Sequence, residues 1–194
     1  MLYTNNPGDH DAQLKAVQAR GYDVLEFDQI VDNHFIHHLE YQQSELRFVR
    51  IDSETVDNLI EKEDSPESVL SEEEQETVKK VFEGLIEGKA GAQVQLKAMS
   101  PEDQPVVITR PEFMRRMKEM QALQGMGGMD FPDSYNVVIN TNHPLIAQKL
   151  LKLDEESARA DLATYLFQLS LLHQNMLKGA ELSSFILRAQ EMIR

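Results

Sequence analysis

Short apolar segments alternate with helical segments over the first 51 residues, and few folds accommodate such an order. The pattern predicts strands at residues 2–4, 22–27 and 47–51, with a helix between Asp11 and Gly21 and another at residues 33–41. Asp11 is placed to cap the first helix, and Gly21 is placed to end it. Strands that alternate with helices favour a parallel sheet with right-handed crossovers. The first half is therefore predicted to be a β-α-β-α-β unit of the α/β class.

The second half combines helices with a small sheet. Ser71 and Glu74 form a capping-box pattern ahead of a helix that reaches about Glu87. Three further apolar segments predict strands at residues 94–98, 106–108 and 135–140, and hence an α+β layer. Residues 61–74, between the halves, are acidic and contain Pro66, which disfavours a continuous helix. We therefore expect two domains, at residues 1–70 and 71–194.

The composition excludes several classes of function. The 194 residues carry 19 Lys and Arg against 33 Asp and Glu, a formal net charge of −14 that is unsuited to nucleic-acid binding. The chain contains no cysteine, which excludes disulfides, cysteine-ligated zinc and thiol catalysis. We expect neither a signal peptide nor a membrane span, because no apolar run approaches about 18 residues. The first turn has the single glycine Gly8 and lacks a phosphate-binding loop, so we expect no nucleotide or other cofactor and no catalytic residue.

A group of histidines in the second predicted helix resembles a metal site. The group comprises Asp32, His34, His37 and His38, of which His34 and His38 share a helical face as two zinc ligands do. No acidic residue lies between them in the order that metalloprotease motifs require. We interpret them as surface histidines and expect no metal.

A further histidine follows the last predicted strand, in the segment at residues 140–144. No serine or cysteine in a nucleophile-elbow context accompanies His143. Asn142 is placed to cap a helix that has Pro144 at its first position. We therefore interpret this segment as structural.

The segment at residues 111–129 contains five of the nine methionines and predicts an amphipathic helix that begins near Pro111 and runs into a glycine-rich stretch. Its apolar side, which we call the Met-rich face, comprises Phe113, Met114, Met117, Met120 and Leu123. Arg115, Lys118 and Glu119 take the opposite side. Methionine side chains are flexible and suit surfaces that accept varied partners. An ordinary core helix explains the same stripe, so both interpretations stay open on the residues alone.

The last 40 residues predict two helices that are rich in apolar side chains. Such helices at a chain terminus require a partner, and a symmetric four-helix contact between two copies is the simplest solution. The residues expected at this contact, which we call the terminal-helix face, are Leu162, Leu166, Leu169, Leu172, Leu182, Phe185, Ile186 and Ala189. The sequence therefore predicts a homodimer closed by a helical bundle.

Four segments, in this order, resemble the ninety-kilodalton heat-shock chaperones, most closely the bacterial members. The segments are residues 20–25 with Asp32, Phe35, Ile36, Leu39 and Glu40; residues 47–53; residues 104–107 with 114–118; and residues 140–146. The last contains an Asn-x-x-His-Pro-Leu pattern. The resemblance covers essentially the whole chain. It identifies residues 1–70 with the end of the family's middle domain and residues 71–194 with its C-terminal domain.

The resemblance implies that the chain is a fragment of a cytoplasmic, ATP-driven chaperone that works as a homodimer. The domain that binds ATP and magnesium would precede residue 1. The Met-rich face would contact unfolded or partly folded client proteins, and the terminal-helix face would hold two copies together. No ATPase activity, nucleic-acid partner or membrane partner is expected of this chain.

Two departures from the family pattern bear on this interpretation. A glycine that often follows the apolar helix is delayed here to Gly179, so we expect a bundle one turn longer. The chain ends without the acidic Glu-Glu-Val-Asp sequence of eukaryotic cytosolic members, which favours a bacterial-type protein. Two alternatives stay open: a pure dimerisation module with no client surface, and an enzyme fragment with its site in the α/β half.

Overall fold

The computed structural model describes residues 1–29, 31–55, 59, 66–123 and 134–191 of the chain. Two compact units are formed, one from Met1–Glu63 with Thr109–Phe131, and the other from Asp64–Ile108 with Pro132–Arg194. The expected division between residues 70 and 71 differs from these units mainly in one segment. Thr109–Phe131, which we assigned to the second half, lies in the first unit.

The first unit contains a three-stranded parallel sheet. Its elements are β1 (Leu2–Thr4), α1 (Asp11–Gln18), β2 (Leu25–Glu26), α2 (Asp32–Gln42), β3 (Val49–Arg50) and, later in the chain, α5 (Glu112–Leu123). The strand order is β2-β1-β3, and Tyr3 of β1 pairs with Leu25 on one side and Arg50 on the other. The predicted parallel arrangement is thus confirmed. The outer strands are shorter than expected, with two residues each beside the three of β1.

Aromatic side chains form a core beside this sheet. The ring of Phe27 lies 5.6 Å from that of Tyr3 and 5.7 Å from that of Phe48, measured between centroids. Ile36 of α2 is buried in the same cluster. Ring pairs at these separations stabilise a core beyond their buried area, and α2 packs on this core through Ile36 and through Phe35, whose ring lies 6.3 Å from that of Phe27.

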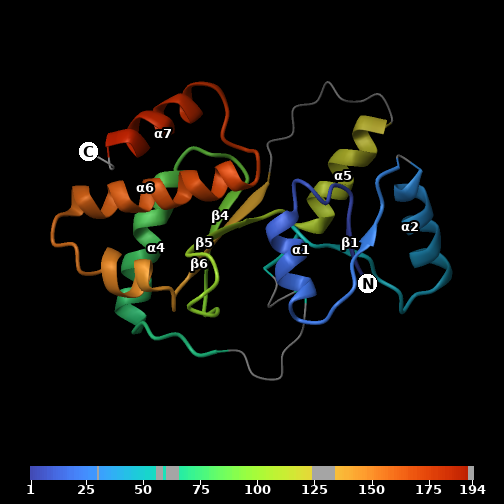
Figure 1. The fold of residues 1–194 in the computed structure, drawn as a ribbon, viewed down its shortest axis with the longest axis horizontal. Coiled ribbons are helices and arrows are strands. Elements are labelled where there is room, and N and C mark those ends of the chain that lie inside the picture. Colours follow the sequence, from blue (N-terminus) through green and yellow to red (C-terminus); the bar gives the residue numbers. More distant parts are fainter. Residues whose placement is uncertain (30, 56–58, 60–65, 124–133, 192–194) are drawn as a thin grey trace. The chain divides into compact units, whose positions relative to one another are not determined.

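The second unit combines a second three-stranded sheet with four helical elements. Its elements are α4 (Glu72–Ile86), β4 (Ala92–Lys97), β5 (Val106–Thr109), β6 (Tyr135–Asn140), the π-helix η1 (Leu145–Leu150), α6 (Glu156–His173) and α7 (Gly179–Glu191). The strand order is β4-β6-β5, with β4 parallel to β6. Helix α4 packs on β4, and α6 packs on α4 (Figure 1). Phe82, Val137 and Phe167 are among the buried residues of the shared core.

Two predicted helix caps are wrong, whereas the capping box is confirmed. Ser71 and Glu74 form the reciprocal hydrogen bonds of a capping box at the start of α4. Asp11, however, is the first residue of α1 and pairs with Lys15 one turn later, 2.7 Å away. Asn142 does not cap η1; the backbone N–H of Leu145 donates instead to Nδ1 of His143, at 3.0 Å.

The end of α6 also corrects an expectation. The helix ends at His173, without an extra turn, and Asn175 adopts a φ of 54°. The backbone N–H of Asn175 donates to the carbonyl of Leu172, and that of Met176 donates to the carbonyl of Leu171. These two bonds are the pattern of a helix that ends in a left-handed residue, usually glycine and sometimes asparagine. Asn175 therefore ends the helix, and Gly179 begins the next one.

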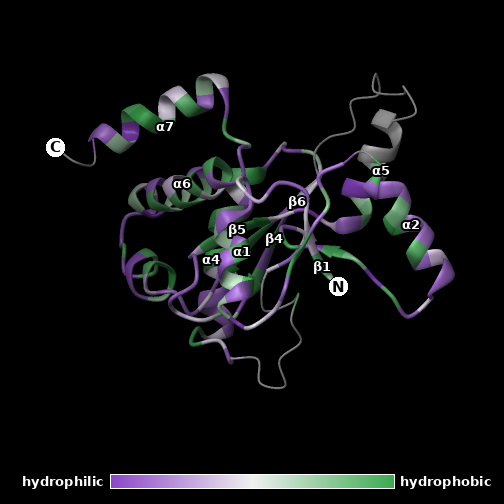
Figure 2. Cartoon of the chain, turned by 45° about the vertical axis from the view of Figure 1, so that its right-hand side comes forward, coloured by the Kyte–Doolittle hydropathy of each residue, from purple (hydrophilic) through white to green (hydrophobic). Residues whose placement is uncertain are grey.

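Among the described helices, none is both long and apolar enough to cross a membrane. Helix α7 instead shows alternating hydrophobic and hydrophilic bands along its length (Figure 2). Phe185 of α7 is buried and its ring stacks on that of Tyr165 of α6, with 5.5 Å between centroids.

Candidate functional site

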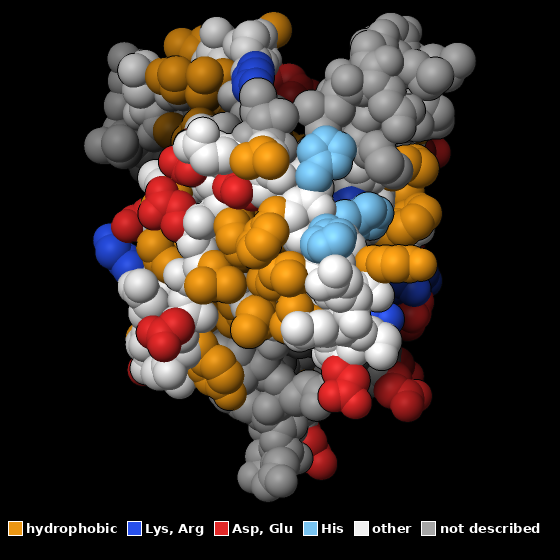
Figure 3. All heavy atoms as spheres, turned by 90° about the vertical axis from the view of Figure 1, so that its right-hand side faces the viewer, with side chains coloured by type: hydrophobic (Ala, Val, Ile, Leu, Met, Phe, Trp, Pro, Cys, Tyr) orange, Lys and Arg blue, Asp and Glu red, His pale blue; other side chains and the backbone are white. Residues whose placement is uncertain are grey.

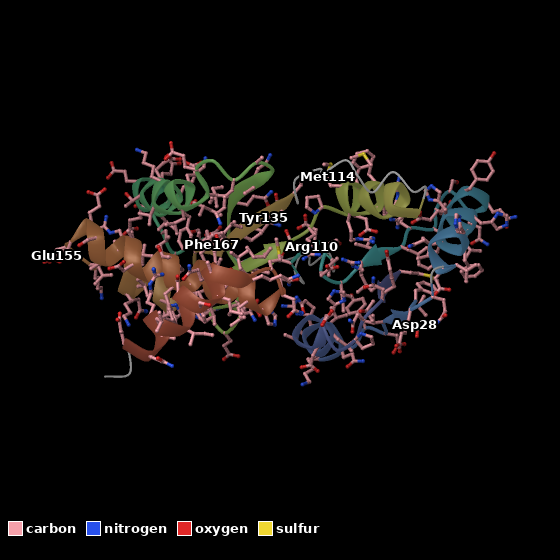
Figure 4. All side chains as sticks on the ribbon, turned by 90° about the horizontal axis from the view of Figure 1, so that it is seen from above. Asp28, Arg110, Met114, Tyr135, Glu155 and Phe167 are labelled. Atoms are coloured by element: carbon pink, nitrogen blue, oxygen red, sulfur yellow. The ribbon has the colours of Figure 1, made fainter. Side chains whose placement is uncertain are left out.

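The Met-rich face lies on α5, directly after Pro111. Phe113 is 75% exposed, whereas Met114, labelled in Figure 4, and Met117 are half-buried. The side chains of Met120 and Leu123 lie outside the described residues. Of the three described members of the face, Phe113 is therefore the most open to solvent.

Two arginines of α5 bind the rest of the first unit, and one of them, Arg115, lies on the side opposite Phe113. Arg115 is only 9% exposed, and one of its Nη atoms donates to the hydroxyl of Tyr3 at 2.6 Å. Its guanidinium also lies over the Tyr3 ring, 5.8 Å from the centroid. Burial raises the pKa of Tyr3, although the charge of Arg115 opposes this effect, so the hydroxyl remains protonated at neutral pH. Arg115 thus connects α5 to the central strand of the sheet.

Arg116 connects α5 to α2 and to the start of β3. Its two Nη atoms donate to the carboxylate of Glu40 at 2.6 and 3.2 Å, and one of them also donates to the carbonyl of Phe48 at 2.6 Å. Glu40 in turn accepts the backbone N–H of Phe48 at 2.8 Å. The pair therefore satisfies both backbone polar groups of a buried residue at the edge of the sheet.

Glu112 joins the two arginines on the first turn of α5. One oxygen of its carboxylate accepts from Nε of Arg116 at 2.6 Å and from an Nη atom of Arg115. Burial alone would raise the pKa of Glu40, but hydrogen bonds from Arg116 and Phe48 and the charge of Arg116 outweigh burial and lower that pKa. Both carboxylates are thus held next to arginine charges.

The terminal-helix face divides into buried and exposed members. Leu166 and Phe185 are buried in the core of their own chain, and Leu162, Leu172, Leu182 and Ala189 are half-buried. Leu169 and Ile186 are 42% and 47% exposed, respectively. Leu187, which the sequence analysis did not single out, is 63% exposed. The exposed members of the face are therefore Leu169 and Ile186, and Leu187 is a further exposed leucine next to Ile186 on α7.

The histidines of α2 lie on the surface. His34, His37 and His38 are all exposed, and Figure 3 shows histidine side chains gathered beside hydrophobic ones on this side of the molecule. Within the described part of the chain, no group of three or more His, Cys, Asp or Glu side chains is arranged to hold a metal ion. Asp32 accepts a hydrogen bond from the backbone of Gln29, which gives it a structural role.

The contacts of Arg115 and Arg116 were not anticipated from the sequence. Helical periodicity assigns Arg115 to the polar side of α5, but it does not reveal what that side faces. Glu40 lies 76 positions before Arg116, and Tyr3 lies 112 positions before Arg115. One signal was available: two adjacent arginines and a glutamate at the start of one helix form an unusually dense group of charges.

Comparison with known proteins gives a consistent result. A family model described as Hsp90 protein matches residues 7–194. A chaperone protein HtpG of Porphyromonas gingivalis is 38% identical over 167 residues, which are 83% of this chain and 24% of that protein. The corresponding protein of Bacteroides thetaiotaomicron is 39% identical over 163 residues, 81% of this chain and 23% of that protein. The chain spans about a quarter of the length of these curated relatives.

Proposed function

Because the chain belongs to the Hsp90 family of heat-shock chaperones, we propose that it supplies client contact and dimerisation to such a chaperone. Client proteins would be unfolded or partly folded polypeptides, which expose apolar side chains. The proposal further assigns ATP and magnesium binding to parts of the family's proteins outside the matched quarter, and it places the protein in the cytoplasm. On this proposal the chain itself hydrolyses no ATP.

The exposure of Phe113 is the observation that supports client contact. Phe113 has three quarters of its surface in water, and a client that buried this side chain would gain roughly 1.5–3 kcal/mol. Phe113 lies on a helix that Arg115, on the opposite side, and Arg116 both attach to the rest of the unit. The helix therefore presents this ring from a fixed support.

The half-burial of Met114 and Met117 favours the alternative, a dimerisation module in which α5 is an ordinary packed helix. Binding of a permanently unfolded protein, reduced and carboxymethylated α-lactalbumin, separates the two. Client contact predicts that Phe113→Ser weakens this binding while the melting temperature stays nearly unchanged, since exposed positions usually shift stability by less than about 0.5 kcal/mol.

Tyr41→Ser is the matched control, because Tyr41 is an exposed aromatic on α2 of the same unit. The control should bind the unfolded protein as the unsubstituted chain does. If Phe113→Ser binds equally well, the client-contact proposal is wrong and the dimerisation module is favoured.

A further inference from the structure

The ion-pair network of α5 determines which side of that helix is available for contact. Successive residues of an α-helix are separated by about 100°, so Phe113 points roughly 200° away from Arg115. Arg115 is buried against Tyr3 of the central strand, which turns Phe113 outward. The direction of the Phe113 side chain therefore depends on how the arginines are held.

Arg116 fixes the rotation of the helix more strictly than a single contact would. Outside its own helix it donates to three acceptors, the two oxygens of Glu40 and the carbonyl of Phe48. A planar guanidinium can satisfy these acceptors only in a narrow range of orientations, whereas a lysine ammonium would satisfy them loosely. Glu40 itself is held by the backbone N–H of Phe48, so neither end of the pair is free to swing.

We propose that Arg116 and Glu40 are positioning residues for client binding, which hold α5 so that Phe113 faces outward. This inference rests on the proposed client contact of the Met-rich face. The pair touches no client itself. Loss of the Arg116–Glu40 pair leaves the apolar side chains in the sequence unchanged but lets the helix rotate or fray. Client binding must then order α5, which lowers the net affinity.

The test is a double-mutant cycle measured as affinity for reduced and carboxymethylated α-lactalbumin, with Arg116→Gln, Glu40→Gln and the double variant of the 194-residue chain. Each single variant is expected to weaken binding roughly 2- to 30-fold, the range typical of residues that act through others. The double variant should bind the unfolded protein about as well as the single variant with the lower affinity, because both changes remove the same interaction. Lys15→Gln is the control, since it removes a charge from an exposed ion pair on α1 of the same unit and should leave binding unchanged.

Two further measurements separate positioning from general instability. Arg116→Lys keeps the charge but not the planar fork, so it should weaken binding at unchanged helix content by circular dichroism. Hydrogen exchange of the α5 amides should become faster in the same variant while exchange in α1, a helix of the same unit, does not change. Unaltered affinity in all Arg116 and Glu40 variants, with Phe113→Ser still defective, overturns the positioning role alone. Unaltered affinity in Phe113→Ser overturns the proposed client contact on which that role rests.

Discussion

The side-chain oxygen of Asn142 accepts a hydrogen bond of 2.9 Å from the backbone nitrogen of Val69, which lies 73 positions earlier in the chain. The side-chain nitrogen of Asn142 donates to the carbonyl of Glu67 at 3.0 Å. One side chain thus pairs with two backbone groups in the segment that leads into α4. These two bonds attach the segment to the turn that follows β6, and a side chain with both an acceptor and a donor is needed to make them.

Replacing Asn142 with Ala is expected to lower the free energy of unfolding by about 1–3 kcal/mol, because two backbone groups lose their partners. Urea denaturation followed by circular dichroism measures this change. Asn142→Asp should also destabilise, since it places a second oxygen against the carbonyl of Glu67. Asn33→Ala, at an exposed position of α2, should stay within about 0.5 kcal/mol and serves as the control. An Asn142→Ala variant as stable as this control would show that the two hydrogen bonds contribute nothing.

The imidazole of His143 makes stability depend on pH. Burial lowers its pKa below the ordinary 6.5, and its Nδ1 can accept the N–H of Leu145 only when that nitrogen is unprotonated. The unfolded chain therefore takes up a proton first as the pH falls. Stability is fully present above pH 6.5 and decreases as the pH falls toward the lowered pKa.

The measurement is urea unfolding at a series of pH values from about 7.5 to 5. His143→Asn keeps an acceptor but does not titrate, so the decrease of stability over this range should be smaller than in the unsubstituted chain. Equal decreases in both proteins would assign the pH dependence to other histidines.

A buried ion pair and an exposed one in the same unit allow a direct comparison. Asp52 and Arg50 are both buried, and their closest contact is 2.5 Å. Burial alone would raise the pKa of Asp52, but the hydrogen bonds from His10 and Arg50 and the charge of Arg50 hold it well below its ordinary value. Asp52→Asn should therefore cost about 1.5–3 kcal/mol, since it removes the charge from the acceptor of buried hydrogen bonds.

Asp11→Asn removes the exposed pair with Lys15 and should change stability by no more than about 1 kcal/mol. Thermal unfolding of both variants under identical conditions gives the comparison. If Asp52→Asn and Asp11→Asn lower the stability by similar amounts, burial does not determine the contribution of these ion pairs.

Substitution of the exposed members of the terminal-helix face tests dimerisation without changing buried core residues. Leu169 and Ile186 are exposed in the single chain, so their replacement by Glu should leave folding intact while placing charges in the proposed contact. The double variant is expected to sediment as a monomer at concentrations at which the unsubstituted chain sediments as a dimer. Tyr41→Glu adds a charge at an exposed aromatic of α2 and should not change the sedimentation behaviour. A dimeric double variant would place the contact elsewhere.

Local sequence patterns predicted much of the fold, whereas the features that depend on long-range contacts could not be predicted. The capping box of Ser71 and Glu74, the strands of both sheets and the glycine after α1 depend on neighbouring residues, which a sequence displays directly. The end of α6 was misjudged because Asn175 takes the left-handed conformation in place of glycine. Arg116 and Asn142 bind partners more than 70 positions away, Glu40 and Val69, and periodicity carries no information about such pairs.

The position of β1 at the centre of its sheet has a consequence for synthesis on the ribosome. The backbone of β1 accepts hydrogen bonds from Phe27 on one side and from Ile51 on the other. Translation proceeds at about 5–20 residues per second, so the strand waits roughly 2–9 s after its own synthesis before β3 emerges. Tyr3 waits longer still for Arg115. Within its sheet β1 is synthesised first, so its pairing with β2 and then with β3 must wait until those strands have followed.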